Sequence, residues 1–347
     1  MTKPTILMIG NHLSTSLHNK NVWHYLAERL ATSGWNVLTT SSKENQILRL
    51  LDMLCTIWNK RHQYEVAQID VFSSKAFVYA NLCSHLLKCL QKKVVLTLHG
   101  GGLPELSVRH PLCLKQVLSS ADVVVTPSGF IQSSLAEMRN DIKLIPNPID
   151  LSHAEFHLRT NISPNLIWVR AFNHVYNPDL APKVVKSLET EYPDIKLIMV
   201  GPDSRDGSLV RMLALARELS VQNRIEVVGG KPHDDIPSWL SKADIFINTT
   251  NYDNMPSSVL EAMACGLPVV STNVGGIPWL ILDGVDGLLV PPDDPVAMAN
   301  AIRKILIDPD LSASLSENAR QKAQMHDWSV ILPQWESLLL SVLDKSR

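Results

Sequence analysis

The chain has few aromatic and charged residues and no long apolar run. Aromatic side chains make up 6% and charged side chains 19% of its 347 residues. No stretch reaches the roughly 18 consecutive apolar residues that a membrane-spanning helix needs, and low-complexity segments are absent as well. With 45% hydrophobic residues, the sequence predicts an ordinary globular protein, long enough for two domains.

Cysteine is also scarce, and the cysteines lack the paired spacing of a metal site or the even number of a disulfide framework. They are Cys55, Cys83, Cys89, Cys113 and Cys265. We expect them to be reduced thiols. The first residues run directly into the apolar stretch Thr5–Ile9, which leaves no room for a signal peptide. We therefore expect a cytoplasmic protein.

The net charge of −2 is unevenly distributed: residues 1–160 carry a balance of +5 and the remainder a balance of −7. Scatter over two solvated surfaces explains this asymmetry, and so does an N-terminal half that faces an anionic membrane or a phosphate-bearing acceptor. Lys88, Lys92 and Lys93, which lie among leucines, suit the second interpretation. The pI of 6.6 and the scattered basic residues argue against a nucleic-acid partner.

Short apolar runs alternate with helix-length amphipathic stretches, which is typical of parallel sheets wrapped by helices. In the first half we expect strands at 6–9, 36–40, 66–71, 94–99, 123–126 and 143–145, and helices at 21–32, 44–58, 76–90 and 128–138. In the second half we expect strands at 166–169, 196–200, 225–228, 245–248 and 269–271, and helices at 179–189, 208–219, 257–264 and 295–307.

The pattern restarts after Ile145–Asp150, where Pro146 and Pro148 favour extended backbone. The predicted fold class is therefore α/β, with two tandem, doubly wound, Rossmann-like domains. The predicted divisions are 1–160, 161–327 and a C-terminal helix at 328–347. We expect that helix to pack back on the first domain. Because open α/β sheets bind ligands at the carboxyl ends of their strands, two such domains facing a cleft suit a two-substrate reaction.

Residues 249–270 combine a strand end, a polar loop, a short helix and a second buried strand. Ser257 or Ser258 can cap this helix. Its N-terminus, at the carboxyl edge of a sheet, would offer free N–H groups and a positive dipole end to an anion. Asp253 precedes the helix and Glu261 lies on it. Their carboxylates could therefore accept hydrogen bonds from vicinal sugar or ribose hydroxyls on either side of a bound phosphate.

After the next strand, Gly275 and Gly276 form a turn that lets the backbone approach a ligand, or a plain strand-to-helix connection. The run Glu261–Val270, followed by Val274–Gly276 and Gly287–Val290, resembles the donor-site signature of glycosyltransferase family 4, the group 1 enzymes of GT-B fold. The resemblance covers the second half nearly end to end and the first half more loosely. It implies a retaining enzyme that transfers a sugar from a nucleotide diphosphate donor to an acceptor hydroxyl.

By position, the resemblance assigns roles in donor binding. Glu261 matches the second acid of the family's paired-acid motif, which holds the donor ribose. Asp253 replaces the first acid with a side chain one methylene shorter than the usual glutamate. The backbone amides of Ser258 and Val259 would contact the distal phosphate, and Arg170 would clamp the diphosphate. The other expected donor-binding residues are Asn254, Met255, Gly201, Lys231 and His174.

The sequence departs from the family after Arg170, where residues 171–178 contain no lysine. The family usually has one there, bound to the diphosphate. Our hypothesis is that His174 or Lys231 supplies the second positive group.

The first half offers fewer candidates. His99 follows a predicted strand and precedes three glycines, and its position resembles a family histidine that contacts the transferring sugar. We therefore group it with Arg170 and Asp253 as candidate catalytic residues. Gly10 and Asn11 follow the first strand and form an acceptor or phosphate loop, or a plain polar loop.

We expect neither a metal ion nor a cofactor, because no Asp-x-Asp pair flanks a strand and no histidines cluster at ligand spacing.

The expected partners are a nucleotide diphosphate sugar, with UDP preferred over GDP, and a saccharide or lipid-linked acceptor. Such a role suits polysaccharide or glycolipid biosynthesis and peripheral contact with the inner face of the membrane through the N-terminal domain. A nucleotide-sugar epimerase of the same fold and a catalytically weak homologue acting as a binding subunit are the alternatives.

Overall fold

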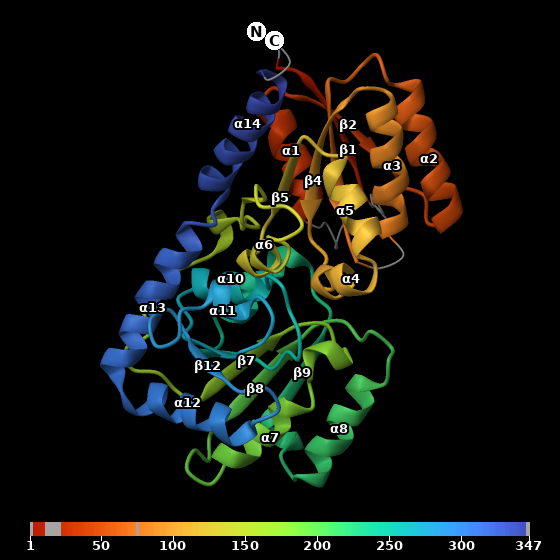
Figure 1. The fold of residues 1–347 in the computed structure, drawn as a ribbon. Coiled ribbons are helices and arrows are strands. Elements are labelled where there is room, and N and C mark those ends of the chain that lie inside the picture. Colours follow the sequence, from red (N-terminus) through yellow and green to blue (C-terminus); the bar gives the residue numbers. More distant parts are fainter. Residues whose placement is uncertain (1–2, 11–21, 74–75, 345–347) are drawn as a thin grey trace. The chain divides into compact units, whose positions relative to one another are not determined.

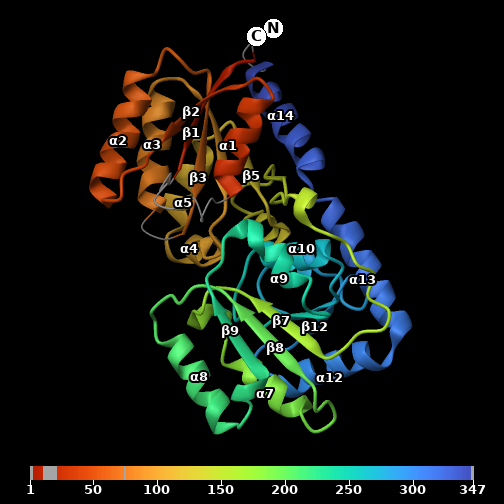
Figure 2. The same ribbon diagram turned by 180° about the vertical axis from the view of Figure 1, so that it is seen from behind.

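The computed structural model describes residues 3–10, 22–73 and 76–344. The chain divides into two compact units, the first formed by 1–148 with 329–347 and the second by 149–328. Each unit is a parallel sheet with helices on both faces (Figures 1 and 2). The predicted α/β class with two Rossmann-like units is confirmed.

The sheet of the first unit has the strand order β2-β1-β3-β4-β5-β6. Its strands are β1 (Thr5–Ile9), β2 (Asn36–Thr40), β3 (Val66–Val71), β4 (Lys93–Leu98), β5 (Val123–Thr126) and β6 (Lys143–Leu144). All neighbouring strands run parallel. Buried on both faces, the inner strands are almost continuously apolar, as parallel sheets require. Their carboxyl ends therefore meet at one edge, where Asp70 and His99 lie.

Helices cover both faces of this sheet. They are α1 (Val22–Thr32), α2 (Gln46–Asn59), α3 (Phe77–Cys89), α4 (Leu103–Arg109), α5 (Pro111–Ser119), α6 (Gly129–Ser134) and α14 (Trp328–Asp344). Helices α2 and α3 lie on the face opposite to α1 and α14 (Figures 1 and 2). The carboxylate of Glu336 on α14 accepts hydrogen bonds from the indole of Trp35, at 3.0 Å, and from Lys3. The C-terminal helix thus belongs to the first unit.

The sheet of the second unit has the strand order β12-β11-β10-β7-β8-β9, again all parallel. Its strands are β7 (Asn165–Val169), β8 (Lys196–Val200), β9 (Ile225–Gly229), β10 (Ile245–Asn248), β11 (Val269–Thr272) and β12 (Leu288–Val290). Its helices are α7 (Leu180–Leu188), α8 (Ser208–Glu218), α9 (Ile236–Leu240), α10 (Ser257–Ala264), α11 (Ile277–Leu280), α12 (Pro295–Ile307) and α13 (Pro309–Gln324).

Alternate residues of each strand in the second unit face opposite helical layers. Leu166 and Trp168 of β7 pack with α7 and α12, whereas Ile167 and Val169 pack with α9 and α10. This double burial fixes the register of the strand, because a slip by one residue would exchange the two layers. The loops that follow β7, β10 and β11 are thereby held at one edge of the sheet.

Every predicted strand is present, with ends within one residue of the prediction. The helices were predicted less well. The helix expected at 128–138 ends at Ser134, because Leu135–Met138 form turns. Helices α4, α5, α9, α11 and α13 were not predicted.

The predicted division at residue 160 differs from the structure, since residues 149–160 belong to the second unit. The N–H of Ile149 donates to the carbonyl of His326 at 2.9 Å. The N–H of Arg159 donates to Oγ of Ser316 at 3.2 Å. These backbone hydrogen bonds, made past the proline joint, attach the segment to α13 and its C-terminal end.

The lysine-rich stretch of α3 and the following turn is not a free basic face. Leu87 is buried, and Leu86 and Leu90 pack against the core. Lys93 is paired with Asp122 at 3.1 Å, and Lys92 donates to a backbone carbonyl at 2.9 Å. These contacts occupy Lys92 and Lys93, and membrane contact by this stretch stays a prediction. Within the described part of the chain, no helix has both the length and the hydropathy of a membrane span.

Candidate active site

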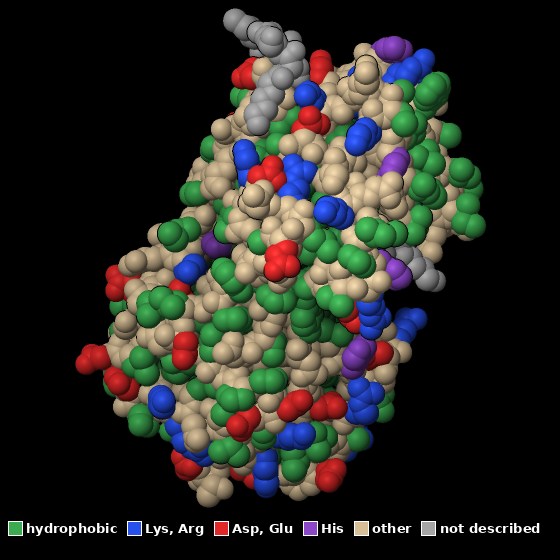
Figure 3. Space-filling model, viewed as in Figure 1, with side chains coloured by type: hydrophobic (Ala, Val, Ile, Leu, Met, Phe, Trp, Pro, Cys, Tyr) green, Lys and Arg blue, Asp and Glu red, His purple; other side chains and the backbone are tan. Residues whose placement is uncertain are grey.

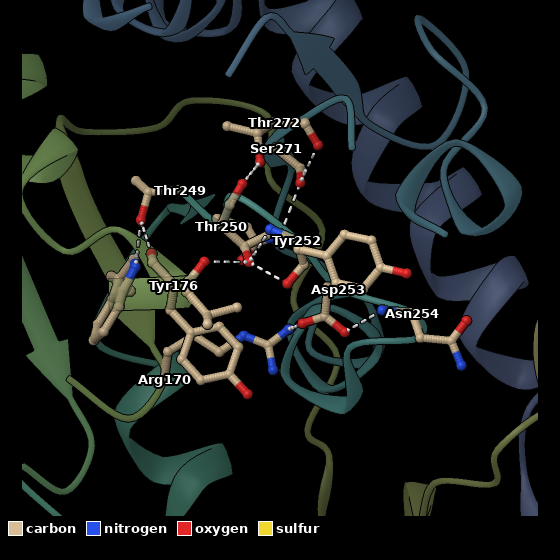
Figure 4. Close-up of polar contacts among 12 residues, drawn as sticks. Arg170, Tyr176, Thr249, Thr250, Tyr252, Asp253, Asn254, Ser271 and Thr272 are labelled. Atoms are coloured by element: carbon tan, nitrogen blue, oxygen red, sulfur yellow. Dashed lines mark hydrogen bonds and ion pairs between the residues drawn. The ribbon is translucent and has the colours of Figure 1, made fainter. Parts of the chain in front are cut away.

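Buried threonines hold the start of the loop between β10 and α10 (Figure 4). Oγ1 of Thr249 accepts from the indole of Trp168 at 2.9 Å and donates to the carbonyl of Tyr176 at 2.8 Å. From the neighbouring strand, Oγ1 of Thr272 donates to the carbonyl of Thr250 at 2.6 Å. These bonds connect the ends of β7, β10 and β11, so the loop that follows is presented from a rigid edge.

Arg170 and Asp253, both predicted as catalytic, form an ion pair at this edge (Figure 4). Nη2 of Arg170 lies 2.6 Å from Oδ2 of Asp253, and each side chain is only 13% exposed. The guanidinium also lies over the ring of Tyr176, at 4.9 Å from its centroid. Its buried Nε has no hydrogen-bond partner among the described residues. The two residues are 83 positions apart in the chain, and the loops after β7 and β10 bring them together.

The two glycines after β11 support the Asp253 loop. The N–H of Gly276 donates to the carbonyl of Asp253 at 2.8 Å. A Cβ at Gly276 would lie 1.9 Å from the carbonyl oxygen of Asn254, and one at Gly275 would lie 2.3 Å from that of Asp253. The close backbone approach that these glycines permit is thus to the Asp253 loop itself.

Gly201, directly after β8, also permits a close approach between two backbone segments. A Cβ at Gly201 would lie 1.7 Å from the carbonyl oxygen of Arg170, so only glycine lets β8 end beside the Arg170 loop. Asn254 donates its N–H to Oδ1 of Asp253 at 2.7 Å. Met255 is partly buried and packs against the core. These predicted donor-binding residues therefore surround Asp253 and Arg170 and fix their backbone.

Helix α10 begins at Ser257, at least one residue earlier than a cap by Ser257 or Ser258 requires. Its N-cap is Pro256, and no side chain caps it, so neither Ser257 nor Ser258 has the expected role. Pro256 blocks further extension of the helix towards its N-terminus. The amides of Ser258 and Val259 are in the first turn, where an α-helix leaves N–H groups without intrahelical acceptors. Oγ of Ser258 is buried and has no partner among the described residues.

Glu261 is paired with a residue that the sequence analysis missed. Nε2 of His233 lies 3.1 Å from Oε1 of Glu261, with the glutamate side chain 15% exposed and the histidine 49% exposed. This hydrogen bond raises the pKa of His233 above its ordinary value. His233 follows the Gly229–Lys231 turn at the end of β9, and that position beside a candidate loop was the only sequence signal for it.

The two candidates for the missing positive group have different neighbours. Nδ1 of His174 lies 3.1 Å from Oδ2 of Asp206, and the ring is 71% exposed. A hydrogen bond from the backbone N–H of His174 and, next in size, hydrogen bonds from Ser208 hold the pKa of Asp206 well below its usual range. Nζ of Lys231 lies 5.7 Å from the ring centroid of Trp239. Neither candidate makes a hydrogen bond with Arg170 among the described residues.

In the first unit, His99 belongs to a buried polar network. Its Nε2 lies 3.1 Å from Oδ1 of Asp70, a residue that the sequence analysis also missed. Gly10 lies next to this pair, since a Cβ there would be 3.2 Å from Oδ2 of Asp70. The other loop candidate, Asn11, lies outside the described residues. A buried carboxylate beside a histidine at a strand end has the chemistry to orient that histidine.

Two family models match the chain. The model described as Glycosyltransferase Family 4 matches residues 38–153, and the model described as Glycosyl transferases group 1 matches residues 155–322. They match parts of both units, and the second includes Arg170, Asp253 and Glu261.

Several curated proteins are similar to this chain in sequence. N-acetyl-alpha-D-glucosaminyl L-malate synthase of Bacillus anthracis is 27% identical over 301 residues, which are 80% of this chain and 77% of that protein. A D-inositol 3-phosphate glycosyltransferase of Xylanimonas cellulosilytica is 30% identical over 167 residues, which are 48% of this chain and 39% of the relative. The chain thus spans less than two thirds of that second protein.

Solved structures share the fold over nearly the whole chain. Sucrose-phosphate synthase from Thermosynechococcus elongatus superposes with a TM-score of 0.81 at 20% identity, covering 99% of this chain and 100% of that one. HepE from Anabaena, solved in complex with UDP and glucose, superposes with a TM-score of 0.76 at 19% identity, covering 98% and 100%.

Proposed function

Since the chain belongs to the group 1 glycosyltransferases of family 4, we propose that it transfers a sugar from a UDP-sugar to an acceptor hydroxyl with retention of configuration. The family supports retention, and the neighbour solved with UDP and glucose supports UDP as the nucleotide. The acceptor is a saccharide or a lipid-linked saccharide in the biosynthesis of cell-surface polysaccharide or glycolipid.

The observation that carries this proposal is the Arg170–Asp253 pair beside the N-terminus of α10. A departing nucleotide diphosphate develops negative charge, which Arg170 and the amides of Ser258 and Val259 would stabilise. The unpartnered Nε of Arg170 gives the guanidinium a further donor for a phosphate oxygen. The donor thereby needs no metal ion for charge neutralisation.

Asp253 and Glu261 would hold the two ends of the donor. The Asp253 carboxylate accepts hydrogen bonds from hydroxyls of the transferred sugar, and Glu261 accepts them from the ribose. The transition state carries positive charge on the sugar ring, which the Asp253 carboxylate also stabilises. Because no further carboxylate is assigned as a nucleophile, the acceptor hydroxyl attacks from the face that the diphosphate leaves.

His174 is the better supported candidate for the second positive group. It lies in the loop after β7, as Arg170 does, and Asp206 orients its ring. Lys231 follows β9 and its ammonium contacts Trp239. We expect His174→Ala to lower turnover more than Lys231→Ala. If both single variants and the double variant retain wild-type turnover, neither residue replaces the family's lysine.

A peripheral location on the inner face of the membrane is also part of the proposal. Helix α2 exposes four large apolar side chains, with 71% of Ile47, 56% of Leu48, 52% of Leu51 and 51% of Trp58 accessible. Figure 3 shows hydrophobic side chains along this edge of the first unit. A row of exposed apolar side chains on one helix is typical of interfacial binding.

A donor panel tests the central proposal. The purified chain is incubated with UDP- and GDP-sugars, with and without saccharide acceptors, and free nucleotide and altered sugar are measured. Release of UDP with retention at the anomeric carbon supports the proposal. Epimerised sugar on an intact donor indicates the epimerase, and no reaction with any donor or acceptor indicates a binding subunit.

A further inference from the structure

We propose that Asp70 is a positioning residue for His99, fixing the tautomer and the plane of its ring at the carboxyl edge of the first sheet. The inference rests on the proposed function only in that His99 contacts a sugar hydroxyl during transfer.

The polarity of the network follows from the indole of Trp23, which can only donate. Its Nε1 donates to Oε1 of Gln68 at 2.8 Å. That bond fixes the orientation of the amide, so Nε2 of Gln68 is the group that faces Thr97 and Asp70. It donates to Oγ1 of Thr97 and to Oδ1 of Asp70, both at 2.8 Å.

The same oxygen of Asp70 faces His99 at 3.1 Å. An ionised carboxylate can only accept, so Nε2 of His99 carries the proton of this bond and Nδ1 holds the lone pair of the neutral ring. The side chain of Asp70 is 5% exposed and Gln68 is 1% exposed. A carboxylate buried to this degree requires its partners, so the network holds one tautomer of His99.

The plane of the ring is fixed by other contacts. His99 stacks on Phe72 with centroids 5.6 Å apart and an angle of 23° between the planes. The N–H groups of His99 and Gly100 both donate to the carbonyl of Val71, at 3.0 and 3.2 Å. A Cβ at Gly100 would lie 2.5 Å from the backbone nitrogen of Ser73, so this close strand end needs glycine. Together these contacts fix the plane of the His99 ring at the strand end.

The test replaces Asp70 by asparagine, which keeps the shape of the side chain and removes its charge. With ¹⁵N-labelled histidine, the wild-type ring of His99, assigned by loss of its signal in His99→Gln, should show protonated Nε2 and unprotonated Nδ1. In Asp70→Asn we expect a mixture of tautomers. We also expect kcat to fall about 100-fold, as for a misplaced reacting group, with the donor KM changed less than about twofold.

Asp122→Asn is the matched control. Asp122 directly precedes β5 of the same sheet and accepts from the N–H of Val94 at 2.9 Å. It makes no hydrogen bond or ion pair with a histidine among the described residues. Its replacement should lower stability and leave kcat and the His99 signals unchanged. If Asp70→Asn does not fold, Trp23→Phe removes the donor that orients Gln68, and a smaller loss of kcat with the same change in tautomer is expected.

The outcomes separate this inference from the proposed function. An unchanged His99 tautomer in Asp70→Asn, together with wild-type kcat, overturns the inference and leaves the transferase intact. A wild-type chain without activity on any donor overturns the proposed function, whereas the tautomer measurement still decides the role of Asp70. Loss of kcat in both Asp70→Asn and Asp122→Asn, with unchanged His99 signals, would indicate a structural role only.

Discussion

The guanidinium of Arg170 and the carboxylate of Asp253 lie 2.6 Å apart. By the family resemblance, Arg170 is expected to bind the diphosphate of the donor and Asp253 its sugar. A diphosphate that binds Arg170 therefore shares it with Asp253. The pair holds both side chains in place before the donor arrives, at the cost of some affinity for the phosphates.

Replacing Asp253 by asparagine should separate the positioning effect of the ion pair from its competition with the donor phosphates. The competing charge is removed, so we expect UDP to bind about fivefold tighter, or roughly 1 kcal/mol, in calorimetric titrations. Turnover should fall about 100-fold, because the sugar loses a charged acceptor in the transition state. Arg170 is left without its partner, which should lower the free energy of unfolding by about 1–3 kcal/mol.

The control for this variant is Asp179→Asn. Asp179 forms an ion pair with Arg211 at 3.6 Å in the same unit, and both partners are more exposed than Arg170 and Asp253. We expect it to change neither UDP affinity nor turnover. Weaker UDP binding in Asp253→Asn would show that the carboxylate supports phosphate binding instead of competing with it.

The His233–Glu261 pair predicts a pH-dependent contribution to stability. The hydrogen bond raises the pKa of His233 above its ordinary value of 6.5. Its contribution is therefore fully present below pH 6.5 and is lost as the pH rises through the raised pKa. Urea unfolding at pH 6 and pH 9 should show a larger difference between wild type and His233→Gln at pH 6. Since His233 is 49% exposed, the difference should stay below about 1 kcal/mol.

A second histidine controls for a general effect of the substitution. His153 is exposed in the same unit, and His153→Gln should show the same stability relative to wild type at both pH values. Equal effects of His233→Gln at pH 6 and pH 9 would contradict the predicted linkage.

Gly276→Ala should be more damaging than a substitution at a strained but open glycine. A Cβ at Gly276 would lie 1.9 Å from the carbonyl oxygen of Asn254. Gly284 has a φ of +75°, and a Cβ there would meet no atom of another part of the chain within 4 Å. We expect a loss of about 3 kcal/mol for Gly276→Ala from the steric clash, and about 1 kcal/mol for Gly284→Ala from backbone strain. Thermal unfolding measures both, and equal losses would refute the assigned clash.

The displaced Asp253 loop should also affect turnover in Gly276→Ala. The carbonyl of Asp253 accepts from the N–H of Gly276, so a shift of this turn moves the carboxylate relative to Arg170. We expect Gly276→Ala to lose most of its turnover at temperatures where it is still folded, and Gly284→Ala to keep it. Full activity of the folded Gly276→Ala variant would mean that the glycine supports only the fold.

The sheets could be predicted from sequence because strands buried on both faces are continuous apolar runs bounded by polar loops. Val66–Val71 and Lys196–Val200 have the same bounds in prediction and structure. Helices such as α13 are less distinct, since its amphipathic pattern is weak and mostly polar. The division at residue 160 was misplaced because hydrogen bonds to α13, far along the chain, determine where residues 149–160 belong.

Site residues could be predicted from the sequence where they belong to a local family motif. They could not be predicted where their partner lies far away in the chain. Glu261 and Asp253 belong to a recognisable local run, and Arg170 follows a clear strand. His233, Asp70 and Asp206 are single polar residues in ordinary loop or strand positions. Only the fold brings His233 to Glu261, 28 positions away, and Asp70 to His99, 29 positions away.

The exposed apolar side chains of α2 predict binding to lipid surfaces. Changing Leu48 and Leu51 together to glutamate places two charges in the row and should abolish cosedimentation with anionic vesicles, because each buried leucine contributes about 1.5–3 kcal/mol to interfacial burial. Both side chains are more than half exposed, so stability should change by less than about 0.5 kcal/mol. Ile307→Glu, at a side chain 73% exposed in the second unit, should leave vesicle binding unchanged. Equal binding of the wild type and the double variant would mean that α2 does not contact the membrane.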